Sequence, residues 1–220
     1  MSNNFYFKKR KLFFNEKLIL LLKNRFKKIY ESDMYQTSHS NIREVSSNLI
    51  CKETIFEEAM NKIHKKFKTI INVTDLKFEK LWLVSSLPDN VNKNALPYVP
   101  HIDKQRYLKA MVYLHDVSFE NGPIHFAKLK NKINIEQKRV KLPQNYKKLR
   151  LNLIDENHLK GNLIPMIGKA GDVIFFDTNT PHKAGVINKG YSRKVLRFDF
   201  SRPSFNSFKE ETETSSYSED

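Results

Sequence analysis

The last third of the chain contains the stretch that decides the fold, Gly171-Asp-Val-Ile-Phe-Phe-Asp-Thr-Asn-Thr-Pro-His182, which runs on through Lys189-Gly190 to Arg193-Lys-Val-Leu-Arg197-Phe-Asp-Phe200. Its apolar, β-branched and aromatic runs predict two strands. The segment Asn188-Lys189-Gly190 between them is typical of a turn. An antiparallel hairpin closed at this turn would place His182 opposite Arg197, with Arg193 on the same face. One face of the predicted hairpin therefore carries a histidine and two arginines.

A second segment, Pro97-Tyr-Val-Pro-His101-Ile-Asp103, offers metal-binding side chains. Residues two apart on an extended chain share a face, so His101 and Asp103 are expected to point the same way. With His182 they would form a facial set of two imidazoles and one carboxylate, which leaves adjacent positions open on an octahedral Fe(II). Zinc could use the same three ligands, but a structural zinc site would have four ligands and usually cysteine.

The composition indicates one globular domain, which we place at residues 1–206. The 220 residues are 40% hydrophobic and 12% aromatic, enough for one substantial core. Cys51 is the single cysteine and cannot form an internal disulfide, so we expect a reducing, cytoplasmic location. The longest apolar run, Leu18 to Leu22, is far below the roughly 18 residues of a membrane span, so we expect no span.

The formal net charge of +15 raises the alternative of a nucleic-acid partner. The lysines are nevertheless scattered through the whole chain. The densest basic groups, Lys8-Lys9-Arg10-Lys11 and Lys27-Lys28, flank an apolar stripe at helical spacing formed by Leu18, Leu21, Leu22, Phe26 and Ile29. A solvated helix face is the simpler interpretation of this charge.

Helices are expected first along the chain, with residues 1–75 mainly helical. An amphipathic helix is predicted within residues 1–34, after a short edge strand at Phe5-Tyr6-Phe7. Thr54 and Glu57 form a capping-box pattern that opens a second helix, which continues to about Ile71. His64 lies among lysines on that helix and is expected to be exposed.

Strands are expected from Leu76 onward. The residues Leu76, Phe78, Trp82 and Val84 alternate and predict a strand that Pro88 ends. Further strands are predicted at 107–114, 124–126 and 165–168, around the strong turn Glu120-Asn121-Gly122-Pro123. Residues 128–162 have no clear period and are interpreted as a long insertion near a pocket mouth. The acidic, serine-rich residues 207–220 are predicted to be disordered. The chain is thus an α+β protein with a sandwich or jelly-roll core over residues 76–204.

Several short motifs in a fixed order resemble one family. They are His101-x-Asp103, then Tyr113-Leu-His-Asp-Val-Ser-Phe-Glu-Asn121-Gly122-Pro123, then Gly171-Asp172-Val-Ile-Phe-Phe, with Pro181-His182 and, eleven residues on, Arg193. Over about residues 78 to 202 the chain resembles the phytanoyl-CoA dioxygenase family of Fe(II)- and 2-oxoglutarate-dependent oxygenases.

This resemblance implies a double-stranded β-helix, a jelly roll flanked by N-terminal helices. It implies that His101, Asp103 and His182 bind Fe(II), and that Arg193 pairs with the distal carboxylate of 2-oxoglutarate. Arg197 becomes a structural partner. The expected reaction is hydroxylation of a small organic substrate by O2, with release of succinate and carbon dioxide.

The same resemblance leaves the substrate open. Family members commonly follow the Asn-Gly turn with a Pro-Gly-Ser-His type loop, whereas this chain has Phe126-Ala127-Lys128-Leu129-Lys130. Asp103 argues against a halogenase, because halide-binding relatives lack this carboxylate. Lys109, Met111 and Tyr113 form one face of a strand that could touch the cosubstrate. Two alternatives remain: an oxygenase acting on nucleic acid or protein side chains, and a non-enzymatic, cupin-like metal-binding protein.

Overall fold

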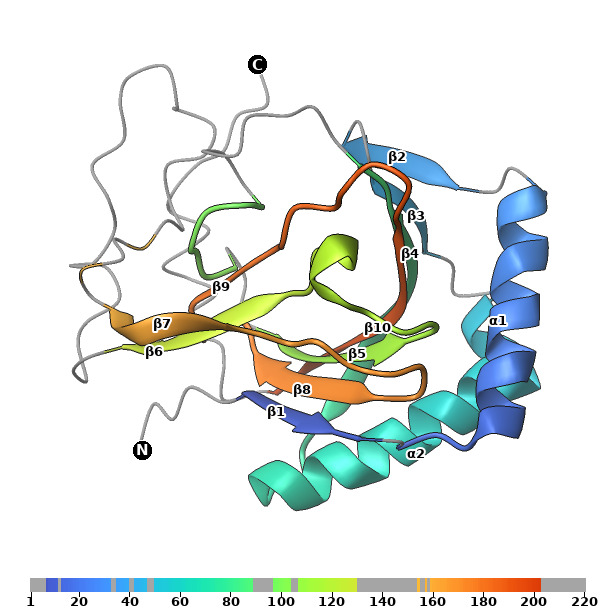
Figure 1. The fold of residues 1–220 in the computed structure, drawn as a ribbon. Coiled ribbons are helices and arrows are strands. Elements are labelled where there is room, and N and C mark those ends of the chain that lie inside the picture. The colour runs from blue at the N-terminus through green and yellow to red at the C-terminus, as the bar shows by residue number, and fades with distance from the viewer. Residues whose placement is uncertain are drawn as a thin grey trace, which may run out of the picture.

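The computed structural model describes residues 7–11, 13–32, 35–39, 42–46, 50–88, 97–103, 107–129, 154, 157 and 159–202. Two α-helices come early in the chain, and most of the strands follow (Figure 1). The predicted disordered tail, most of the insertion 128–162 and the residues Phe5 and Tyr6 lie outside the described residues.

Both helices are amphipathic, and capping residues mark the start of the first and the end of the second. Helix α1 (Glu16–Glu31) begins after Asn15, whose side chain accepts a hydrogen bond from the backbone N–H of Leu18. Helix α2 (Thr54–Ile71) ends at Asn72 in the left-handed conformation. The predicted capping box of Thr54 and Glu57 is wrong, because the helix is capped by Glu53 and no side-chain capping bond forms.

A seven-stranded antiparallel sheet forms the larger layer, in the order β1-β8-β5-β10-β4-β3-β2. Its strands are β1 (Phe7–Arg10), β8 (Val173–Asp177), β5 (Leu108–Tyr113), β10 (Arg193–Ser201), β4 (Lys77–Ser86), β3 (Ile42–Ser46) and β2 (Gln36–His39). The basic group at residues 8–11 thus lies mostly in an edge strand and not on a helix. Figure 1 shows α1 and α2 along the outside of this sheet.

The outer face of the sheet packs on the helices to form the main core. Side chains that alternate along β8 and β10, among them Phe175, Phe198 and Phe200, contact buried helix residues such as Phe67. Leu21, assigned to the apolar stripe from the sequence, is instead 48% exposed. The side chains on the inner faces of the same strands point away from the helices, so they can line a pocket.

A three-stranded sheet, in the order β7-β6-β9, covers that inner face. It consists of β7 (Leu159–Pro165), β6 (His125–Leu129) and β9 (His182–Lys183). The strand predicted at 165–168 is wrong beyond Pro165, because Met166 and Ile167 are in no strand and Gly168 forms only an isolated bridge with Val117. Both ends of the predicted insertion belong to strands. The two facing sheets are the double-stranded β-helix expected from the resemblance.

The strand predicted from Leu76 contains a bulge that its alternation did not reveal. In the pairing of β4 with β10, Asp199 faces Lys80 but Phe200 faces Phe78, so Glu79 is an extra residue. The bulge reverses which side chains face the helices. Phe78 packs on the helix side, whereas Trp82 lies on the pocket side with Val84, so these residues do not share one face as their alternation in the sequence would suggest.

The predicted hairpin between His182 and Arg197 is also wrong. The turn exists, since the N–H of Tyr191 donates to the carbonyl of Asn188 and Gly190 has a φ of 87°. However, β9 pairs with β6 in the small sheet, while β10 pairs with β4 and β5 in the large one. His182 and Arg197 therefore approach each other across the pocket, from different sheets.

None of the described helices is both long enough and apolar enough to cross a membrane.

Candidate metal and cosubstrate site

Three side chains converge between the two sheets. His101 and His182 form an isolated antiparallel bridge, in which each backbone N–H donates to the carbonyl of the other residue at 2.9 and 2.8 Å. Two residues further along the same segment, the N–H of Asp103 donates to the carbonyl of Thr178 at 3.1 Å and holds Asp103 in place. The ligand atoms of His101, Asp103 and His182 all lie within 4.8 Å of one another. The structure thus brings all three predicted metal ligands together.

Backbone carbonyls set the orientation of both imidazoles. Nδ1 of His101 lies 2.8 Å from the carbonyl of Val99, and Nδ1 of His182 lies 2.8 Å from that of Thr180. A carbonyl can only accept, so each Nδ1 carries the proton and each Nε2 keeps its lone pair. These Nε2 atoms lie 3.9 and 3.3 Å from Oδ1 of Asp103. Such an arrangement is suited to a metal ion.

The pKa shifts of His101 and Asp103 favour the protonation states that a metal requires. Burial, together with the neighbouring His182, lowers the pKa of His101 to about 3. Burial alone would raise the pKa of Asp103, but Lys109 and the two histidines hold it well below its usual value. A neutral imidazole and an ionised carboxylate are the states that bind metal ions.

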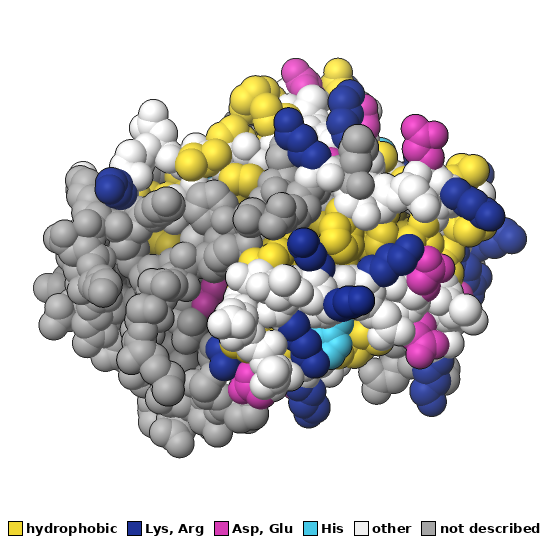
Figure 2. All heavy atoms as spheres, turned by 90° about the horizontal axis from the view of Figure 1, so that it is seen from below, with side chains coloured by type: hydrophobic (Ala, Val, Ile, Leu, Met, Phe, Trp, Pro, Cys, Tyr) yellow, Lys and Arg dark blue, Asp and Glu magenta, His cyan; other side chains and the backbone are white. Residues whose placement is uncertain are grey.

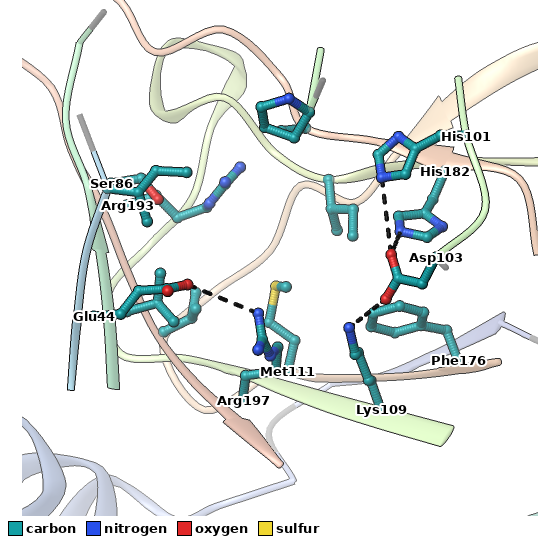
Figure 3. A pocket seen from close by; sticks show the side chains of 16 residues that line it. Glu44, Ser86, His101, Asp103, Lys109, Met111, Phe176, His182, Arg193 and Arg197 are labelled. Carbon is teal, nitrogen blue, oxygen red and sulfur yellow. Dashed lines mark hydrogen bonds and ion pairs between the residues drawn. The ribbon is translucent and has the colours of Figure 1, made fainter. Parts of the chain in front are cut away.

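Lys109 projects from β5 toward the second oxygen of the same carboxylate. Its Nζ forms an ion pair with Oδ2 of Asp103, while Oδ1 faces the histidines (Figure 3). Of the residues predicted on one face of this strand, Lys109 and Met111 line the pocket. Tyr113 is fully buried instead, and its hydroxyl donates to the carbonyl of Met166.

Arg193 lies at the start of β10 and is a buried cation that forms no ion pair with an acidic side chain of the described residues. The residue is 8% exposed, and its Nη1 is buried with no hydrogen-bond partner among the described residues. Burial lowers the pKa of this guanidinium, yet an arginine remains charged in proteins. An unpaired buried charge is costly, so this position fits an anionic ligand such as a carboxylate.

Arg197, four residues further along β10 and on the same face, already has its partners. Its Nε lies 3.2 Å from Asp199, and its guanidinium stacks 4.7 Å from the centre of the Trp82 ring. The prediction that Arg197 has a structural role therefore agrees with its contacts. The contrast between a compensated and an uncompensated arginine distinguishes the two residues without reference to a family.

A pocket of about 380 Å³ joins these groups. Its wall includes the apolar residues Val84, Ile124 and Phe176, and Figure 3 shows the triad and Arg193 on opposite sides of it. Two wall residues, Glu44 and Ser86, were not predicted from the sequence. Glu44 comes from β3, which pairs beside β4 and was assigned to the helical part of the chain.

The turn at Asn121 and Gly122 also contacts the segments next to Arg193 and β9. The side-chain amide of Asn121 donates to the carbonyl of Ser192 at 2.8 Å, which positions the residue before Arg193. Gly122 has a φ of 62°, and a Cβ there would lie 2.4 Å from the carbonyl oxygen of Gly185. Only glycine permits this close approach between the turn and the segment that follows β9.

The remaining histidines have structural contacts or lie elsewhere. Nε2 of His115 accepts the backbone N–H of Lys194 at 2.9 Å. His64, predicted to be exposed, is half-buried; its Nε2 lies 2.8 Å from the carbonyl of Leu76, and its ring stacks on Phe200. His125 lies outside the triad, and His158 lies outside the described residues.

Solved structures with a similar architecture include the three that follow. The epimerase SnoN from nogalamycin biosynthesis is 17% identical, with a TM-score of 0.65 over 89% of this chain and 77% of SnoN. HygX from Streptomyces hygroscopicus, solved with nickel and 2-oxoglutarate, is 14% identical, with a TM-score of 0.64 over 90% of this chain and 83% of HygX. A prolyl-4-hydroxylase from Pseudomonas putida is 14% identical, with a TM-score of 0.56 over 89% and 92% of the two chains. At these identities the likeness establishes a shared fold.

A search of curated protein sequences finds no match. The family model of phytanoyl-CoA dioxygenase, in contrast, matches residues 13–195, which include the triad of His101, Asp103 and His182 and also Arg193. Because this match spans most of the chain, the protein belongs to the phytanoyl-CoA dioxygenase family of iron- and 2-oxoglutarate-dependent oxygenases.

Proposed function

We propose that the protein hydroxylates a small organic molecule, with His101, Asp103 and His182 as the ligands of Fe(II) and Arg193 as the anchor of 2-oxoglutarate. One observation carries the proposal: two imidazole Nε2 atoms and a carboxylate oxygen converge on one side of a pocket, and the buried guanidinium of Arg193 lies on the other side, where its Nη1 has no hydrogen-bond partner among the described residues. The triad supplies three adjacent ligands and leaves room for a chelating cosubstrate and O2. The guanidinium supplies the planar pair of donors that a carboxylate prefers.

The bound iron, with 2-oxoglutarate and O2, supplies the oxidising power that replaces a C–H hydrogen by hydroxyl and releases succinate and carbon dioxide. The residues of the chain position and protect these groups. The bridge between the segments of His101 and His182 fixes the two imidazoles. Apolar side chains such as Phe176 and Met111 keep water from the pocket wall. No side chain is required as a general base.

A small molecule is the substrate class that the observations support best. SnoN has been solved with nogalamycin RO, and HygX has been solved with hygromycin B. On the face in Figure 2, Lys and Arg side chains are spread over the described surface, with Asp and Glu among them. A continuous basic stripe, which would favour a nucleic-acid substrate, does not form on the described part of that face.

Replacement of His182 tests the iron site. His182→Ala removes one ligand of the triad, so the variant should retain no Fe(II) after anaerobic loading and dialysis. It should also form no succinate from 2-oxoglutarate and O2. His115→Ala is the matched control and should retain iron, because His115 contacts backbone groups away from the triad. An unchanged iron content in His182→Ala would contradict the assignment.

Replacement of Arg193 tests the cosubstrate anchor. Arg193→Ala should raise the Kd for 2-oxoglutarate by roughly 30-fold or more, since the loss of one partner of a buried charged pair costs about 2–5 kcal/mol. Calorimetric titration of the Mn(II)-loaded protein measures this change. Arg197→Ala is the comparison, and its Kd should change little because Asp199 and Trp82 hold Arg197. The opposite ranking of the two variants would move the anchor to Arg197.

Lys109 is expected to stabilise the metal-free site. Lys109→Met leaves Asp103 as a largely buried carboxylate without its cation, at a cost of about 3–5 kcal/mol in the free energy of unfolding. Mn(II) should restore stability, because the metal cation replaces the lost charge. Urea unfolding with EDTA and with Mn(II) measures both effects. Lys169→Met is the control: its pair with Asp116 is exposed and should be worth less than about 1 kcal/mol. Equal stabilities of the two variants in EDTA would exclude this role.

A further inference from the structure

Glu44 is an acidic side chain in the pocket wall that neither the iron site nor the cosubstrate anchor uses. It lies on β3, opposite Val84 in the strand pairing, and points into the pocket on the side away from the triad (Figure 3). We propose that Glu44 is the substrate-recognition residue of this pocket and binds a protonated amine. This inference rests on the proposed function, since it concerns the substrate of the same site.

The contacts around Arg197 leave Glu44 without a hydrogen-bond donor among the residues that the structure describes. Asp199 accepts hydrogen bonds from Nε of Arg197 at 3.2 Å and from its Nη2 at 3.4 Å. Asp199 also accepts the indole N–H of Trp82 at 2.8 Å. Glu44 approaches the same guanidinium only at 4.0 Å, beyond hydrogen-bond distance. Asp199 therefore compensates Arg197, and Glu44 adds a second carboxylate to a single cation.

This excess negative charge lies in a partly desolvated place. The Glu44 side chain is 18% exposed, and among the described residues no donor hydrogen-bonds to its carboxylate. A carboxylate that loses water without gaining a donor is destabilised, so a ligand that brings a charged donor gains affinity there. Glu44 is in this respect the counterpart of Arg193, whose unpaired charge calls for an anion.

The positions of the two residues separate the cosubstrate from the substrate. In the sheet, Glu44 faces Val84 and Val84 faces Val195, so Glu44 lies level with the residue midway between Arg193 and Arg197. A second carboxylate near Glu44 would be repelled, whereas an ammonium group would be attracted. The surrounding wall, with Ile42, Val84 and Met111, is apolar. The pocket is therefore suited to a substrate with a cationic head and an aliphatic body.

Three probes of equal length test this inference: hexylamine, 1-hexanol and hexanoate. Each is titrated calorimetrically into the protein loaded with Mn(II) and 2-oxoglutarate, so that Arg193 is already occupied. Hexylamine should bind at least about tenfold more tightly than 1-hexanol, the effect of a charge-assisted hydrogen bond. Hexanoate should bind no better than the alcohol.

Glu44→Gln should abolish the preference for hexylamine over 1-hexanol while the Kd for 2-oxoglutarate stays unchanged, which shows that the pocket is intact. Glu58→Gln, on the outer helix α2 and with its side chain 51% exposed, is the matched control and should keep the preference. Equal binding of hexylamine and 1-hexanol by the wild type overturns the inference. A preference for hexylamine that survives in Glu44→Gln overturns it too.

A metal-free arm separates this inference from the proposed function. Glu44 does not contact the triad, so the comparison of hexylamine with 1-hexanol is repeated on the protein in EDTA. Failure of the wild type to bind Mn(II) or 2-oxoglutarate would count against the proposed function. The amine preference and its loss in Glu44→Gln would still be measured in that arm, where they support or overturn the role of Glu44 directly.

Discussion

The site depends on one pair of backbone hydrogen bonds, those between His101 and His182. These residues are 81 positions apart in the sequence, yet each donates its N–H to the other's carbonyl. The bridge joins the segment of His101, which precedes β5, to the short strand β9. It places the two imidazoles with ring centres 4.4 Å apart. Asp103 follows two residues later on the same extended segment, so its carboxylate necessarily reaches the same point. The geometry of the metal site is thus a consequence of strand pairing.

The charges of the pocket divide into compensated and uncompensated groups, and this division organises its chemistry. Asp103 with Lys109, and Arg197 with Asp199, are pairs that the protein completes by itself. Nη1 of Arg193 has no hydrogen-bond partner among the described residues, and Glu44 reaches only Arg197, at 4.0 Å, a cation that Asp199 already neutralises. Since an uncompensated charge in a pocket wall is costly, these two positions indicate where ligands complete the structure. Lys109 pairs with one oxygen of the Asp103 carboxylate, so a metal ion at the triad would be held by the other oxygen, which faces the histidines.

The sequence predicted the jelly-roll class, the dependence on iron and 2-oxoglutarate, and the convergence of the three ligands, and the first two are confirmed by the family match and the fold. The strands β5 and β8 could be predicted from local sequence patterns, because a buried strand is a run of apolar residues. The bulge at Glu79 and the assignment of β9 to the small sheet could not be predicted, since both depend on pairing between distant segments. Glu44 was missed for the same reason: only its place beside β4 brings it into the pocket.

A crystal structure with Mn(II) and 2-oxoglutarate tests the central claim most directly. The account predicts one metal ion bound by Nε2 of His101, Nε2 of His182 and Oδ1 of Asp103, with the distal carboxylate of 2-oxoglutarate on the guanidinium of Arg193. A metal ion bound elsewhere, a triad side chain turned away from it, or a distal carboxylate on Arg197 would contradict the account.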